Sequence, residues 1–143
     1  MILAIDPGSE KTGIALVSED GACVFKKIIP TENLETDIAE IFENEIPHVL
    51  VLGNGTHHKE MKRRLEIFSA EKKFEIPIAL VNEKYTTEMG EARWKKEHPA
   101  KGLAKLFPEG LREVKEPVDD YVAWIIGQIY LGVIKEEDVG HKK

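Results

Sequence analysis

Two apolar runs separated by only a few polar residues open the chain, in the stretch ILAIDPGSEKTGIALV (residues 2–17). A connection this short joins antiparallel neighbours, so the stretch predicts a hairpin of two strands, Ile2–Asp6 and Thr12–Ser18. The turn at 19–21 then leads into a third strand, Ala22–Ile29. The beginning of the chain is therefore expected to be an antiparallel meander, with Asp6 at the end of its first strand.

The rest of the chain alternates apolar strands with helices. Strands are expected at His48–Gly53 and Pro77–Val81, and helices between 31 and 47, after the turn at 54–56, from 88 to 96 and from 117 to 133. Thr86 or Thr87 is the expected cap of the third helix, and Pro117 suits the first turn of the last one. Residues 98–117 are expected to form an ordered but irregular loop. Strands separated by helices add to a sheet in parallel. We therefore predict an α/β fold with a mixed five-stranded sheet, three antiparallel strands and then parallel additions, and helices on both faces.

The size and the cysteine content narrow the class of protein. A chain of 143 residues fits one domain over 1–143, with 135–143 expected to be a frayed tail. No stretch approaches the roughly 18 apolar residues of a membrane span, so no membrane partner is expected. The single cysteine, Cys23, cannot form an internal disulfide, which favours an inert thiol and a cytoplasmic location.

Acidic residues stand where the expected elements begin or end. Asp6 ends the first strand and Glu83 follows the last one, at the sheet edge where ligands of α/β proteins bind. At about 100° per residue from Val118, Asp119 lies near 100°, inside the apolar arc of the last helix, and Asp120 lies near 200°, outside it. An acid on a buried stripe is costly unless it is paired or binds a metal, which favours Asp119. Interaction with the helix dipole is the structural alternative for either aspartate.

These carboxylates point to metal chemistry. Asp6, Glu83 and Asp119 are hard oxygen ligands suited to Mg²⁺ or Mn²⁺. Two such ions can orient a water for in-line attack on phosphorus and stabilise the leaving oxygen. The chain contains no phosphate-binding Walker loop.

The net charge of −6 is unevenly distributed, because basic residues exceed acidic ones over 56–116. This segment can present a positive face to phosphates although the whole chain repels them. Trp94 is a candidate for stacking on an unpaired base, with helix packing as its structural alternative. The candidate nucleic-acid contacts are Lys11, Lys62, Arg63, Arg64, Lys84, Arg93, Lys95 and Lys96.

Three motifs resemble the RuvC and YqgF group of RNase H-like nucleases. ILAIDPGSEKTGIALV resembles the strand-Asp-x-Gly-turn-strand motif, VNEKYTTEMGEA resembles the YqgF motif after the last strand, and PVDDYVAWIIGQIYL resembles the helix with the last aspartate. The resemblance implies an RNase H-like fold in which Asp6, Glu83 and an acid at 119 or 120 hold one or two divalent cations. The YqgF pattern aligns with Asp119 and the RuvC pattern with Asp120, so both remain candidate catalytic residues. Lys84 stands where YqgF sequences usually have arginine, and GNGTHH replaces their Gly-x-Pro loop.

The resemblance implies a divalent-metal-dependent endonuclease that hydrolyses phosphodiester bonds in structured nucleic acid. Its substrate would be branched DNA, as in Holliday junction resolution, or a ribosomal RNA precursor. The alternative is an RNase H-like module that binds nucleic acid or a protein without cutting. Asp-x-Gly before a strand also opens actin-like and sugar-kinase ATPases, but these need two such domains around the nucleotide. A monomer and a homodimer both remain open.

Overall fold

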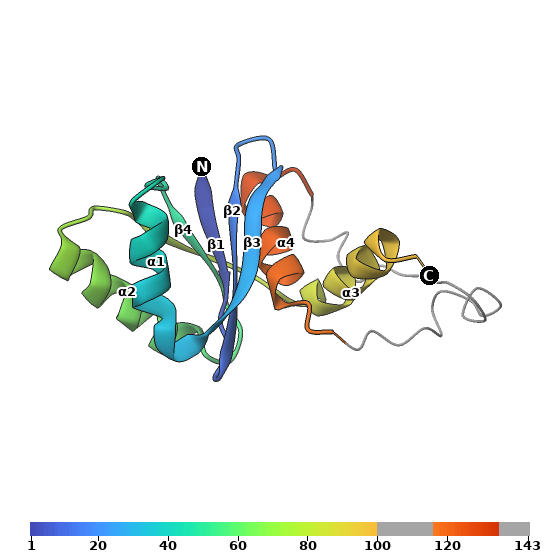
Figure 1. Ribbon diagram of the computed structural model, residues 1–143, viewed down its shortest axis with the longest axis horizontal. Helices are drawn as coiled ribbons and strands as arrows, with labels where there is room; N and C mark the ends of the chain where they lie inside the picture. Colours follow the sequence, from blue (N-terminus) through green and yellow to red (C-terminus); the bar gives the residue numbers. More distant parts are fainter. Residues whose placement is uncertain (100–115, 135–143) are drawn as a thin grey trace.

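The strands form one mixed sheet in the order β3-β2-β1-β4-β5. The computed structural model describes residues 1–99 and 116–134 (Figure 1). Its strands are β1 (Ile2–Asp6), β2 (Lys11–Val17), β3 (Cys23–Pro30), β4 (Leu50–Gly53) and β5 (Ile78–Val81). The β1–β2 and β2–β3 pairs are antiparallel, and the β1–β4 and β4–β5 pairs are parallel. The predicted meander with two parallel additions is confirmed.

Helices cover both faces of this sheet, as predicted. The 3-10 turn η1 (Thr31–Asn33), α1 (Leu34–Phe42) and α2 (His58–Lys72) lie on one side, and α3 (Thr86–Glu97) and α4 (Asp119–Leu131) on the other (Figure 1). The alternation of side chains along a strand divides the core between the two sides. In β1, Leu3 and Ile5 pack towards α1 and α2, whereas Ile2 and Ala4 pack towards α4. All four side chains are fully buried.

The ends of two helices differ from the sequence expectations. Helix α3 begins at Thr86 after Tyr85, which has φ 69°, and no side chain caps it. The Thr86 hydroxyl donates to the Glu83 carbonyl instead, so the expected threonine cap is wrong. Helix α4 begins at Asp119 with Val118 as its N-cap residue, which leaves Pro117 outside the first turn. The expected loop at 98–117 and the tail at 135–143 fall almost wholly outside the described residues.

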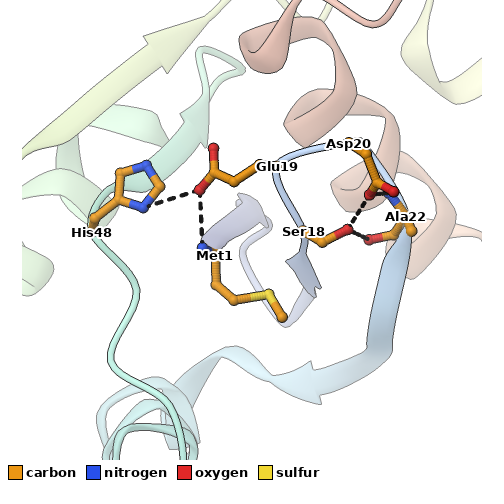
Figure 2. A network of polar contacts seen from close by, with 6 residues as sticks. All are labelled: Met1, Ser18, Glu19, Asp20, Ala22 and His48. Atoms are coloured by element: carbon orange, nitrogen blue, oxygen red, sulfur yellow. Dashed lines mark hydrogen bonds and ion pairs between the residues drawn. The ribbon is translucent and has the colours of Figure 1, made fainter.

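Polar contacts link the segments at the end of the sheet where β1 begins (Figure 2). The Met1 amino group lies 3.0 Å from Glu19 Oε1, and His48 Nδ1 lies 3.4 Å from the same oxygen. The Ser18 hydroxyl contacts both Asp20 and the Ala22 carbonyl within the β2–β3 turn. These contacts occupy the end of the sheet where β1 begins. The other end, where β1, β4 and β5 all terminate, is therefore the edge at which side chains following these strands meet.

Across the described ranges, no helix has the length and apolar character needed to span a membrane.

Candidate active site

Asp6 lies at the carboxyl end of the central strand β1, with its backbone paired to Gly13 of β2. The pKa of the Asp6 carboxyl is raised to about 9, mainly by burial and in addition by the charges and hydrogen-bonding contacts of Glu83 and Asp119. Like charges beside a desolvated carboxylate disfavour its ionised form. The three acids predicted from the sequence are thus brought together at one point of the sheet edge.

The Glu83 backbone is held by contacts from two sides. Its N–H donates to Asn54 Oδ1 at 3.2 Å, and its carbonyl accepts from the Thr86 amide at 3.0 Å and the Thr86 hydroxyl at 2.6 Å. The backbone N–H of Asn54 in turn donates to the Val81 carbonyl at 2.9 Å. These bonds tie the end of β5 to the turn after β4, which fixes where the Glu83 side chain starts.

Two glycines of that turn make room for the Glu83 carboxylate. A Cβ on Gly55 would lie 1.9 Å from Glu83 Oε1, and a Cβ on Gly53 would lie 2.8 Å from Oε2. At 1.9 Å a Cβ on residue 55 would overlap the carboxylate. The Glu83 carboxylate can therefore occupy this position only because residue 55 is glycine. The Gly-Asn-Gly sequence alone does not reveal this role, because the contact joins segments about thirty residues apart in the chain.

Asp119 reaches the site because helix α4 starts directly against β2. A Cβ on Gly13 would lie 1.9 Å from the Asp119 carbonyl oxygen. Burial raises the pKa of the Asp119 carboxyl, and the charge of Lys11 partly offsets that rise. Glycine at position 13 is therefore what allows the first residue of α4 to approach Asp6.

Asp120 is directed to a different partner. Its Oδ2 lies 3.0 Å from Lys26 Nζ, and the same ammonium lies 3.8 Å from the centre of the Tyr121 ring. After burial, the neighbours that raise the pKa of Asp6 most are Glu83 and Asp119. Of the two aspartates left open by the sequence, the structure places Asp119 beside Asp6 and pairs Asp120 with β3.

The carboxylates of Asp6, Glu83 and Asp119 are chemically suited to bind a hard divalent cation. Carboxylate oxygens are the ligands that Mg²⁺ and Mn²⁺ prefer. A cation among Asp6, Glu83 and Asp119 would relieve the repulsion that raises the pKa of Asp6. Within 1–99 and 116–134, however, no three His, Cys, Asp or Glu side chains already stand in the arrangement of a metal site.

The basic candidates are distributed over three places. Lys11 begins β2 and Lys84 follows Glu83, so both lie at the carboxylate edge, and both are exposed. Lys62, Arg63 and Arg64 lie on α2, and Arg93, Lys95 and Lys96 lie on α3. The two helices lie on opposite sides of the sheet (Figure 1). The charge of Lys11 acts on Asp119, whereas the Lys84 ammonium lies 5.0 Å from the centre of the Tyr85 ring.

Three residues proposed as nucleic-acid contacts have partners within the fold, and one of them, Arg64, pairs with Glu35. The Arg93 guanidinium donates to Gln128 Oε1 at 2.8 Å and lies 4.4 Å from the centre of the Trp124 ring. Trp94 packs against the core under α4 and stacks on His98, with ring centres 4.2 Å apart. Both side chains hold α3 in place, which supports the packing alternative for Trp94.

The five-stranded sheet and its helices form an RNase H-like fold, as the similarity to RuvC given below shows. The sequence profile described as RuvX, Holliday junction resolvase, matches residues 1–132, so the chain belongs to that family. Membership of this family supports nuclease activity for the protein. No curated protein sequence matches the chain.

Among solved structures, RuvC of Thermus thermophilus is similar with a TM-score of 0.51 at 14% identity, covering 87% of this chain and 88% of that one. This similarity shows the RNase H-like fold. A ROK family protein from Streptococcus pneumoniae TIGR4 in complex with sucrose matches with a TM-score of 0.43 at 16% identity, over 67% of this chain and 39% of that one.

The raised pKa of Asp6 gives a prediction for the metal-free protein. Glu83→Gln removes one neighbouring negative charge, so the pKa of Asp6 should fall below about 9. It should stay above the ordinary value, because burial is the largest cause and remains. Carboxyl NMR titration of Asp6 measures this shift. Asp120→Asn is the matched control and should leave the Asp6 titration in place. An unchanged pKa in Glu83→Gln would contradict the contact.

Proposed function

We propose that this protein is a divalent-metal-dependent endonuclease that cuts strands at four-way DNA junctions. The observation that carries the proposal is the convergence of Asp6, Glu83 and Asp119 at the carboxyl edge of the sheet. Membership of a family described as Holliday junction resolvases supports branched DNA as the substrate. Asp6, Glu83 and Asp119 would hold Mg²⁺ or Mn²⁺, which when bound supplies a Lewis acid and an activated water.

The protein's own groups contribute position and charge. Three carboxylates alone repel a phosphodiester, and the exposed ammonium groups of Lys11 and Lys84 offset part of that repulsion at the same edge. With a pKa of about 9, the carboxyl group of Asp6 would hold a proton near neutral pH in the metal-free state, and it would be deprotonated as a ligand of a divalent cation. The turn at Gly53 and Gly55 keeps the Glu83 carboxylate turned towards Asp6.

A cleavage assay tests the proposal. A labelled four-way junction and a single-stranded RNA of equal length are incubated with the protein and Mn²⁺ or Mg²⁺. We expect the junction to be cut, and Asp6→Asn to slow cutting by more than about a hundredfold, since losing a ligand costs more than losing a residue that orients one. Asp20→Asn is the matched control, because Asp20 lies in the β2–β3 turn at the opposite end of the sheet. Cutting of neither substrate by the unaltered protein would refute a nuclease, and cutting of the RNA alone would reassign the substrate.

Metal affinity gives a second test, through a residue that donates no ligand. Gly55→Ala places a methyl group where Glu83 Oε1 now lies, so the carboxylate must move. We expect Mn²⁺ binding, measured by calorimetry, to weaken about 10–100-fold, the usual effect of disturbing a residue that orients a ligand. Ser69→Ala on α2 is the control, because it leaves the site untouched. A second glycine substitution, Gly132→Ala, would not serve, because Gly132 has φ 77° and alanine would strain the backbone there. Unaltered Mn²⁺ affinity in Gly55→Ala would contradict a role for Glu83 as a ligand.

A second candidate function is a module that binds nucleic acid without cutting it. One observation favours it, namely that the side chains of 1–99 and 116–134 hold no ready three-residue metal arrangement. This candidate predicts that the protein binds junctions but shows no saturable Mn²⁺ or Mg²⁺ binding. The calorimetric titration described above distinguishes the two functions.

A further inference from the structure

The turn between β4 and α2 is held by a histidine that follows it. His58 is the first residue of α2, and its side chain is half-buried. Its ring Nδ1 lies 2.7 Å from the Gly55 carbonyl oxygen, and its backbone N–H donates to the same oxygen at 3.1 Å. A carbonyl oxygen only accepts hydrogen bonds, so Nδ1 carries the proton of this contact. Two donors of one residue therefore hold the Gly55 carbonyl.

This turn has little order of its own. The Glu83 carboxylate needs glycine at both 53 and 55, because a Cβ at these positions would lie 2.8 Å and 1.9 Å from its oxygens. Glycine has more backbone freedom than any other residue, so a turn with two glycines moves unless hydrogen bonds fix it. On the β4 side, the backbone N–H of Asn54 donates to β5 at 2.9 Å. On the α2 side, the two bonds from His58 fix it.

The same arrangement occurs at the other segment that carries the site. Thr86 is the first residue of α3, and its amide and hydroxyl both donate to the Glu83 carbonyl, at 3.0 and 2.6 Å. Each segment is thus held by the backbone and the side chain of the first residue of the following helix. Thr86 fixes the backbone of Glu83, and His58 fixes the glycine against which the Glu83 carboxylate lies.

We propose that His58 is a positioning residue of the carboxylate site, which keeps the Glu83 carboxylate beside Asp6 by holding the Gly55 carbonyl. The assignment rests on the proposed nuclease function, since His58 acts through a residue that would bind the metal. Ligands bind a metal tightly only when their side chains are held in the binding geometry. Loosening the turn therefore weakens metal binding although all three carboxylates are still present.

Two substitutions separate the hydrogen-bond donor of His58 from the bulk of its ring. His58→Phe keeps a ring and removes the donor, whereas His58→Asn removes the ring and places an amide N–H close to the position of Nδ1. We expect Mn²⁺ binding, measured by calorimetry, to weaken about tenfold in His58→Phe, the effect of losing a partner that orients a ligand. His58→Asn should bind Mn²⁺ nearly as tightly as the unaltered protein.

The neighbouring histidine provides the matched control. His57 lines a cavity together with Met61 and Arg64 of α2, and His57→Phe should leave the Mn²⁺ affinity unchanged. If His58 only stabilised the start of α2, His58→Phe would lower the thermal unfolding temperature and leave the Mn²⁺ affinity of the folded protein unchanged. That result would overturn the positioning role.

Crystal structures of the metal-free variants give a readout that needs neither metal nor cutting. We expect the Glu83 carboxylate to move away from Gly55 in His58→Phe and to stay against it in His58→Asn. A carboxylate that stays in place in His58→Phe would overturn the proposal, even where the metal affinity falls. If His58→Phe does not fold, His58→Asn decides alone, and a displaced Glu83 in that variant would overturn the role of the donor.

These measurements separate the two proposals. If the unaltered protein binds no Mn²⁺ or Mg²⁺, the metal-dependent nuclease fails. The metal-free structures then decide by themselves whether His58 positions Glu83. If the metal binds and His58→Phe changes neither the affinity nor the place of Glu83, the nuclease stands and the role of His58 fails.

Discussion

The mutual repulsion of three carboxylates is the constraint on which this site depends. Asp6, Glu83 and Asp119 lie together on a partly buried edge, where burial, as the largest cause, and the charges of the two neighbours raise the pKa of Asp6 to about 9. A carboxyl whose pKa is higher in the folded than in the unfolded state favours folding at low pH, and this contribution is lost as pH rises through the folded pKa. The metal-free fold should therefore lose stability between about pH 4 and pH 9, and a bound divalent cation should restore it.

The backbone brings these charges together against their repulsion. Parallel pairing of β1, β4 and β5 places the ends of these strands at one edge, and the antiparallel hairpin places Gly13 opposite Asp6. Glycines at 13, 53 and 55 then let the Asp119 backbone and the Glu83 carboxylate approach more closely than any side chain would permit. The core under α4 supplies the free energy that holds this arrangement.

Much of this arrangement could be predicted from the sequence, because it depends on local patterns. Asp6 ends one apolar run, Glu83 stands two residues after another, and the helical period places Asp119 on the inward arc. The contacts between distant segments could not be predicted in the same way. The charge of Arg93 suggested a phosphate contact, whereas the fold stacks it on Trp124. The pairing of Asp120 with Lys26 likewise depends on how α4 crosses β3, which no local pattern encodes.

The most direct test of this account is the position of Mn²⁺ in crystals of the protein, located by its anomalous scattering. The account predicts a peak bound by carboxylate oxygens of Asp6, Glu83 and Asp119, while Asp120 keeps its contact with Lys26. A peak bound by Asp120 in place of Asp119, or no peak at this edge at Mn²⁺ concentrations that support cutting, would contradict it.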